Sequence, residues 1–427
     1  MRISNVYKLK YGLLIYLMVL FSSLVLFQFG GRTWFLYLQI LFCIIMVVST
    51  KKVRILPYQM INSIFLWMIV SAISGYVGNT VESYKKAAVI MALFMVPMYF
   101  SVSYLHGLIK KNANYLTLIV KALKCMCLLQ LFWIPFQYIA YNFAGLDINK
   151  ILFSDMLHFT EKTSFIRSWV YYPSGFTHHS AVLASLFVLA FFLFENLPIR
   201  ILILIDSIIC GNSTAFVGVV IALAMTIGFK VFDRQRNRRM KIKLQTILFC
   251  GIALIVGFYL FNRFSIKNVL VERILYLWGR LFGNQIDDST SAHLQYFNDY
   301  FTVVKNGSLM QTLLGCGEGC SGYYISTMYN RYTSLGNWSI ECDIVNIALC
   351  RGIIGFIIYY VFLVYIAIKG FKLDKRYFIV MISIIIQGFG YNVQWDYVFF
   401  VEIILFFTIK LGINFFEIDK EVVYKKW

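Results

Sequence analysis

Two arginines in the segment 263–283 have the type and spacing to bind a phosphate group. Arg273 and Arg280 are seven residues apart, so on a helix they share one face. The planar guanidinium fork suits bidentate binding of phosphate oxygens. Another face carries an apolar stripe that consists of Leu270, Ile274, Leu277 and Leu281. Together with Trp278, this stripe predicts a helix lying on a membrane surface. The two arginines then either bind a lipid-linked phosphate or diphosphate, or contact lipid headgroups only.

Acidic and basic residues also mark the start of the apolar segment that follows. Glu341 and Asp343 fall in its first turn, where a carboxylate caps the positive end of the helix dipole or acts as a general base. Arg351 lies about two turns further in. An arginine is costly in lipid and should therefore face a cavity or a partner, which makes Arg351 a candidate functional residue.

The segment 289–305 is helical in pattern and places His293, Tyr296 and Tyr300 on one face. A histidine can act as a general base near neutral pH, and tyrosine rings can stack on sugars. Simple hydrogen bonding is the other interpretation of His293. The segment therefore offers a candidate base and a candidate sugar contact at Tyr300.

The segment 315–322, GCGEGCSG, predicts a tight irregular turn because glycine adopts positive φ freely. Successive amides in such a turn can bind an anion, so Gly317 and Gly319 are candidate substrate contacts; a purely structural turn is the alternative. Cys316 and Cys320 are four residues apart and could form a disulfide on an oxidising side of a membrane.

Two more candidate substrate contacts lie earlier in the chain, around a long loop at 143–173. Arg167 closes that loop, and His178 stands beside His179 where the next apolar segment begins. Without a third ligand the two histidines do not make a metal site, so no metal is expected.

The composition shows what kind of molecule must position these residues. Of 427 residues, 60% are hydrophobic and 14% are charged, with a mean hydropathy of +0.73. A soluble protein carries about 25% charged residues, so a soluble enzyme is excluded, as is a disordered chain. Nine cysteines in a chain of this length do not suggest a secreted disulfide scaffold. The remaining class is an all-α polytopic membrane protein.

A helix needs about 20 apolar residues to cross a bilayer. That length predicts about twelve spans: 11–29, 33–50, 57–78, 87–108, 115–142, 174–194, 198–210, 212–231, 244–262, 339–368, 376–394 and 396–414. The span 198–210 is short enough to be a half-crossing.

The net charge of +19 sets the expected orientation. With the N-terminus inside, 24 of the 39 Lys and Arg residues fall in cytoplasmic segments and 12 fall outside, as the positive-inside rule requires. Both termini are then cytoplasmic, and the basic run at 234–239 is interpreted as a topology anchor rather than a nucleic-acid site. The expected organisation is nine spans in 1–262, a large outer loop with amphipathic helices in 263–338, and three spans with a cytoplasmic tail in 339–427.

Four motifs in the region 167–368 resemble the bacterial O-antigen polymerase and O-antigen ligase superfamily, and more closely its polymerase (Wzy-type) branch: SGFTHHSAVLASL, GNSTAFVGVVIAL, LLGCGEG and SIECDIVNIALCRGIIGFIIYY. The ligase branch typically carries a histidine where this chain has Glu341, which favours the polymerase. An arginine that the family places early in the second helix of the long loop is replaced near His293. Arg273 and Arg280 would then bind the diphosphate.

The resemblance implies a GT-C-like glycosyltransferase in the bacterial cytoplasmic membrane, with its active site facing outward. Donor and acceptor would be undecaprenyl-diphosphate-linked oligosaccharides, and the growing glycan would move to a sugar hydroxyl without a metal or another cofactor. The expected partners are membrane lipids and a chain-length regulator protein, with no nucleic acid. An O-antigen ligase and a lipid-linked glycan flippase are the alternatives, although a flippase would be expected to carry charges along many spans with short loops.

Overall fold

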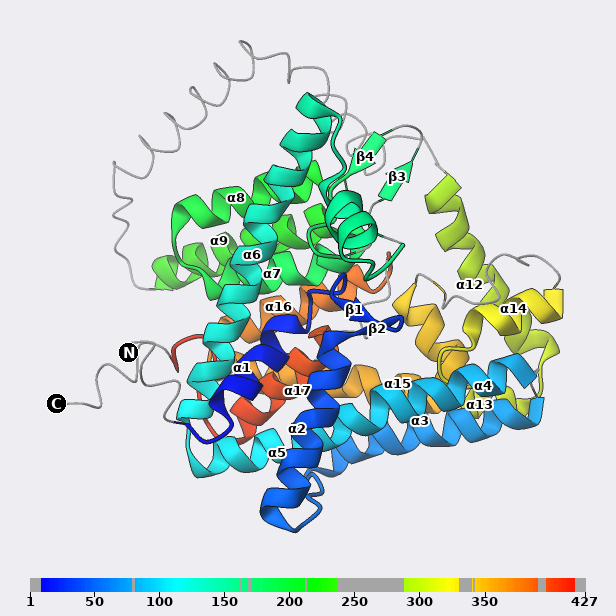
Figure 1. Ribbon diagram of the computed structural model, residues 1–427. Helices are drawn as coiled ribbons and strands as arrows, with labels where there is room; N and C mark the ends of the chain where they lie inside the picture. Colours follow the sequence, from blue (N-terminus) through cyan, green and yellow to red (C-terminus); the bar gives the residue numbers. More distant parts are fainter. Residues whose placement is uncertain are drawn as a thin grey trace.

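The computed structural model describes residues 9–78, 81–161, 163, 165–167, 170–177, 179–211, 213–236, 288–329, 340, 342–390 and 397–418. The chain in these ranges is mainly helical (Figure 1). Three helices are long and apolar enough to cross a membrane: Ala87–Lys111, Asn114–Ala144 and Asp343–Phe371. This agrees with a helical membrane protein. The count of twelve spans stays a prediction, and the predicted span 244–262 lies outside the described residues.

The first half of the chain forms six helices among the described residues, with α4 and α5 joined by a π-helical segment, Met91–Met95. They are α1 (Gly12–Phe21), α2 (Trp34–Thr50), α3 (Gln59–Gly78), α4 (Val81–Ile90), α5 (Val96–Lys111) and α6 (Asn114–Ala144). Pro97 comes just after this π-helical segment and lies inside the continuous helix Ala87–Lys111.

A second π-helical segment, Lys150–Met156, follows α6, and a 3₁₀ turn, Ser180–Leu183, leads into the later helices. These are α7 (Ala184–Leu193), α8 (Leu197–Ile209), α9 (Ser213–Arg236), α12 (Asp288–Asn306), α13 (Leu309–Leu314), α14 (Ser321–Tyr329), α15 (Asp343–Phe371), α16 (Lys375–Gln387) and α17 (Tyr397–Lys410).

Two small antiparallel hairpins correct the all-α expectation. In the first, β1 (Gln28–Phe29) pairs with β2 (Arg32–Thr33) across Gly30 and Gly31, which both adopt positive φ. A two-residue turn of this kind favours a hairpin. In the second, β3 (Phe165–Arg167) pairs with β4 (Val170–Tyr172). Strands of two or three residues are too short to show the alternation that identifies a strand in a sequence.

The basic segments that were assigned to one side of the membrane contact one another. The Tyr104 hydroxyl donates to the carbonyl of Lys52 at 2.8 Å, and the Tyr115 hydroxyl donates to that of Lys10 at 2.6 Å. The Lys410 ammonium lies 5.0 Å from the centre of the Tyr365 ring. These segments therefore form one end of the helix bundle, called the basic end below.

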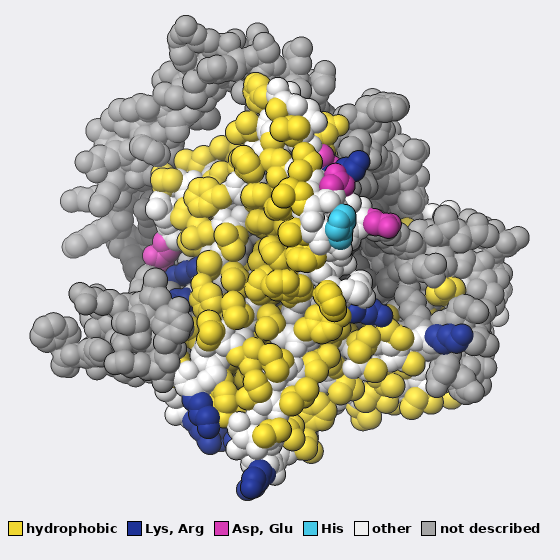
Figure 2. Space-filling model, in the orientation of Figure 1, with side chains coloured by type: hydrophobic (Ala, Val, Ile, Leu, Met, Phe, Trp, Pro, Cys, Tyr) yellow, Lys and Arg dark blue, Asp and Glu magenta, His cyan; other side chains and the backbone are white. Residues whose placement is uncertain are grey.

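The described surface is rich in apolar side chains. Hydrophobic side chains cover most of the described part of the face seen in Figure 2, whereas Lys and Arg stand mainly toward the edges of that part. Large apolar side chains are exposed on many helices, for example Val48 on α2, Phe132 on α6 and Ile357 on α15. A surface this apolar suits contact with lipid rather than water.

A second hydrophobic core lies beside the main one and joins residues 288–329 to the bundle. It combines side chains from the last part of α3, the end of α4, α12, the turn 315–320, α14 and the start of α15: Ala72, Ala87, Tyr296, Val303, Cys316, Cys320, Tyr324, Ile325, Ile340, Cys342, Val345 and Leu349. In Figure 1, α12, α13 and α14 lie against the ends of α3, α4 and α15. The described part of the predicted outer loop is thus packed on the spans.

Candidate functional site

The residues predicted to act on substrate fall into three groups. The structure describes both the position and the burial of Arg351, Tyr300, Gly317 and Gly319. His293 belongs to α12, and Arg167 belongs to β3, where it pairs with Val170. The other four predicted site residues lie outside the described residues: Arg273, Arg280, Glu341 and His178.

Arg351 forms a buried ion pair with Glu318. Its Nε donates to Glu318 Oε2 at 2.7 Å, and its Nη2 donates to Oε1 at 3.0 Å. The two side chains are 1% and 0% exposed. A bidentate pair this deeply buried compensates for the loss of water around both charges. Arg351 therefore meets a partner from the glycine-rich turn, 33 residues earlier in the chain.

The pair lies beside a break in α15. Gly352 has φ of +66° and ψ of −177°, so the helix is interrupted there and nearby carbonyls lose their helical donors. The turn supplies replacements: the amides of Cys316 and Gly317 donate to the carbonyls of Leu349 and Cys350 at 2.8 and 3.1 Å. The amide of Gly317, one of the two glycines predicted to contact an anion, is therefore bonded to α15.

Glycines allow the turn and α15 to approach this closely. A Cβ on Gly315 would lie 2.2 Å from the Cys350 carbonyl oxygen, and one on Gly352 would lie 2.2 Å from the Leu313 carbonyl oxygen. Both glycines also have positive φ, +85° and +66°, which side-chain-bearing residues rarely adopt. Any larger residue at either position must separate the two segments.

Helix α3 forms the third side of this unit. A Cβ on Gly75 would lie 2.1 Å from the Cys316 carbonyl oxygen. The Ser74 hydroxyl donates to the carbonyl of Gly315 at 3.3 Å, and Trp67 Nε1 donates to the carbonyl of Arg351 at 2.6 Å. The turn 315–320, α15 and α3 thus form a single packed unit, called the turn unit below.

Further polar groups continue from Arg351 into the bundle. Its guanidinium lies 5.6 Å from the centre of the Tyr359 ring, and the Tyr359 hydroxyl donates to Glu402 of α17 at 3.1 and 3.2 Å. Glu402 is fully buried, and so is Asp206 in α8. Ionisable groups at such positions are expensive and usually functional.

Tyr300 lies next to a small pocket on the α12 side of the turn unit. Burial raises the pKa of Tyr300, so its hydroxyl keeps its proton at neutral pH. The pocket volume is about 10 Å³, room for one water molecule rather than a sugar ring. Its lining consists of Tyr300, Val303, Val304, Gln311, Thr312, Cys316, Tyr324, Ala348 and Leu349.

The two cysteines of the turn do not form a disulfide with each other. The Cys316 thiol instead shares a hydrogen bond with the thiol of Cys350. Within the described ranges, no group of three or more His, Cys, Asp or Glu side chains is placed to hold a metal ion. The expectation of metal-independent chemistry stays a prediction.

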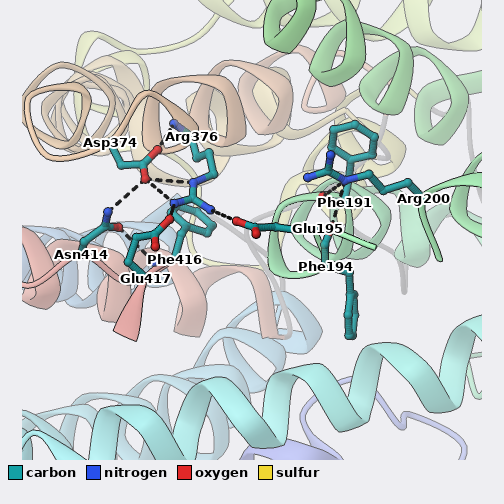
Figure 3. Close-up of polar contacts among 9 residues, drawn as sticks. All are labelled: Phe191, Phe194, Glu195, Arg200, Asp374, Arg376, Asn414, Phe416 and Glu417. Atoms are coloured by element: carbon teal, nitrogen blue, oxygen red, sulfur yellow. Dashed lines mark hydrogen bonds and ion pairs between the residues drawn. The ribbon is translucent and has the colours of Figure 1, made fainter. Parts of the chain in front are cut away.

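A second ionic cluster lies at the basic end of the bundle (Figure 3). Arg376 of α16 binds Asp374 and Glu417, and its Nη1 lies 3.4 Å from Glu195 in the α7–α8 turn. Beside it, Arg200 Nε donates to the carbonyls of Phe191 and Phe194 at 3.2 and 2.9 Å. This end cluster joins three segments that were all assigned to the cytoplasmic side.

Glu318 and Glu402, two carboxylates near Arg351, were not predicted from the sequence as site residues. Glu402 could have been found by the argument used for Arg351, because it is a single charge within the apolar run 397–409. Glu318 stood inside a recognised motif, but nothing in the sequence pairs it with Arg351. Asp206 is likewise a lone carboxylate in the short apolar segment 198–210.

A comparison with known protein families finds no matching family, and a search of curated proteins finds no match to the chain.

Proposed function

We propose that the chain polymerises lipid-linked oligosaccharide repeat units into a surface polysaccharide, as an O-antigen polymerase does. One observation carries the proposal furthest. Two motifs on which the resemblance rests, 313–319 and 339–360, pack against each other in the turn unit. The Glu318–Arg351 pair and the close contacts of Gly315 and Gly352 join the two motifs, and Gly75 of α3 adds a third close contact. Motifs with a shared function are expected to meet in space.

The reaction moves a glycan from a diphosphate to an alcohol. The hydroxyl oxygen of the acceptor sugar attacks the anomeric carbon of the donor, the carbon–oxygen bond to undecaprenyl diphosphate breaks, and that bonding pair stays with the diphosphate. In this proposal Arg273 and Arg280 stabilise the charge on the departing diphosphate. Glu341 accepts the hydroxyl proton, with His293 as the second candidate base.

Other predicted contacts take supporting roles in the proposal. Arg167, His178 and Tyr300 would contact the glycan, with Gly317 and Gly319 shaping the turn nearby. Arg351 is better assigned as a positioning residue than as a substrate contact, because its Nε and Nη2 already bind Glu318. It would hold the turn against the helix that Glu341 precedes.

The proposed setting is the bacterial cytoplasmic membrane with both termini inside and the reaction on the outer face. The contacts among basic segments at one end of the bundle support such an orientation. The proposed partners are the undecaprenyl-linked donor and acceptor, membrane lipids and a chain-length regulator. A ligase of the same superfamily would use the same donor with a different acceptor.

One observation favours a second candidate function, a lipid-linked glycan flippase. Arg351, Glu402 and Asp206 are buried in α15, α17 and α8, so ionisable groups are spread over several apolar helices. Transporters use such groups along their substrate paths. A flippase would be expected to carry such charges along many spans with short loops, whereas this chain has the long segment 263–338, which favours the polymerase.

The experiment compares single variants by the chain length of the surface glycan. Arg273→Ala or Arg280→Ala should abolish long chains while the protein stays in the membrane at normal amount, and Glu341→Gln should do the same. Arg263→Ala, in the same segment but not on the shared face, is the matched control and should keep normal chains. Normal chain length in both Arg273→Ala and Arg280→Ala would contradict the diphosphate role.

A further inference from the structure

The depth of the turn unit can be measured along α3. The ring of Tyr58, just before α3, lies 5.8 Å from the Lys410 ammonium at the basic end. Gly75 follows Tyr58 by 17 residues, which corresponds to about 26 Å at the helical rise of 1.5 Å per residue. A hydrocarbon core is about 30 Å thick, and any tilt of α3 brings Gly75 deeper.

Helix α15 gives a second depth from the same reference point. The ring of Tyr365 lies 5.0 Å from the same Lys410 ammonium. Gly352 precedes Tyr365 by 13 residues, or about 20 Å along the helix axis. Two helices therefore place their contacts with the turn about 20 to 26 Å from the basic end, within the expected thickness of the core.

Because the glycines of α3 and α15 contact the segment before the turn and the turn itself, these two segments lie at the same depths as the glycines. Gly352 meets the backbone of Leu313, and Gly75 meets the backbone of Cys316. Irregular backbone is tolerated at membrane depth only where protein surrounds it and satisfies its polar groups. The turn meets this condition, because Cys316 and Gly317 donate to α15 and Ser74 donates to the Gly315 carbonyl.

Helix α13 leads directly into the turn and exposes large apolar side chains. Leu309 and Met310 are 73% and 61% exposed, although α13 packs against both α3 and α15. Exposed apolar side chains also stand next to the glycine contacts on those two helices, Ile73 on α3 and Ile353 on α15. All three helices that pack around the glycine contacts therefore expose apolar side chains there, as lipid contact would require.

We propose that the segment 309–317 is re-entrant: it lies within the outer leaflet, and Leu309 and Met310 contact lipid acyl chains. The expected large outer loop 263–338 would then be divided by a membrane-inserted piece between α12 and α14. This inference rests on depth, burial and exposure, and it holds whichever function the protein has.

The experiment measures the environment of a spin label attached through a genetically encoded keto amino acid, because the chain has nine cysteines of its own. Full-length protein in phosphatidylcholine and phosphatidylglycerol vesicles is labelled at position 309 or 310. Position 357, on the exposed side of α15, is the lipid-facing control, and position 305, near the end of α12, is the water-facing control.

Labels at 309 and 310 should collide readily with dissolved oxygen and poorly with a water-soluble nickel chelate, as the label at 357 does. A nickel collision rate at 309 and 310 equal to that at 305 would overturn the proposal. As a second readout, a membrane-impermeant biotinylating reagent should label Leu309→Lys at least tenfold more slowly than the native Lys305 in the same chain. Equal rates would also contradict a re-entrant segment.

Discussion

Two arginine-centred ion clusters among the described residues stand in contrasting surroundings, one toward each end of α15. Arg351 pairs with Glu318, and both side chains are almost completely buried. Arg376 in the end cluster shares three carboxylates, and its partner Glu195 is 54% exposed. Both clusters join distant segments. The two clusters are expected to differ in how much stability the protein loses when one charged side chain is removed.

The difference follows from hydration. If Arg351 is lost, Glu318 keeps a negative charge that neither water nor another cation in the described surroundings is placed to balance, so the penalty is large. If Arg376 is lost, its carboxylates can recover water, and Asp374 keeps the hydrogen bond that Asn414 Nδ2 donates to it at 3.0 Å. A fully buried pair is therefore costly to break, whereas the partly exposed end cluster has several partners and some access to water.

The largest expected effect comes from Arg351→Ala. This change should lower the free energy of unfolding in detergent by about 3–5 kcal/mol, because it leaves a buried carboxylate unpaired. The double variant Arg351→Met with Glu318→Leu should regain most of that loss, since both charges are then gone. Thermal unfolding of the purified protein measures both. A loss below about 1 kcal/mol for Arg351→Ala would remove the contrast with the end cluster.

A smaller effect is expected from Gly352→Ala at the break in α15. The added Cβ would meet the Leu313 carbonyl at 2.2 Å and would stand at positive φ, a strain on the order of 1–3 kcal/mol. Gly228→Ala is the matched control, because nothing lies within 4 Å of its Cβ and alanine favours the helix. Equal stability of the two variants by thermal unfolding would show that the turn does not need its close contact with α15.

Arg376→Ala should cost about 1 kcal/mol or less, and the loss should shrink as salt concentration rises. The exposed Lys372, in the same turn region, provides the control Lys372→Ala, which should leave stability unchanged. Unfolding is measured at low and high sodium chloride. A loss from Arg376→Ala as large as that from Arg351→Ala would mean that burial does not distinguish the two clusters.

The smallest expected effect is a pH dependence at the end cluster. Burial opposes ionisation of Asp374, but hydrogen bonds from Arg376 and Asn414 outweigh it and lower the pKa of Asp374 below its usual value. Its stabilising contribution is therefore fully present above its unfolded pKa near 3.9 and is lost as pH falls through the lower folded pKa. Between pH 6 and pH 3 the free energy of unfolding should fall less steeply in Asp374→Asn than in the unaltered chain. An identical slope in both proteins would exclude Asp374 as a contributor.

The sequence predicted a helical membrane protein because composition determines which segments favour lipid, and three long apolar helices agree with that class. The count of twelve spans and the orientation of the termini stay predictions, although Lys10, Lys52 and Lys410 all make contacts at the basic end. Arg351 was recognised as a buried charge that needs a partner. Its pairing with Glu318 depends on the close approach that Gly315 and Gly352 permit, and such long-range geometry leaves no local signal.

The cysteines and the hairpins illustrate the same difference between local and long-range information. Spacing suggested Cys316 with Cys320, but the break in α15 brings Cys350 beside Cys316 instead. The hairpin at 28–33 had a local signal in Gly30 and Gly31, although its strands were too short to be recognised. Arg273, Arg280 and Glu341, the residues proposed to carry the chemistry, remain predictions from sequence.

The central claim is that the chain joins repeat units, and glycan chain-length analysis of a strain lacking the protein tests it most directly. The account predicts that long chains disappear while a single repeat unit stays attached at the cell surface, and that the intact chain restores the polymer. Loss of all attached glycan would point to a ligase or a flippase, and an unchanged polymer would contradict the account.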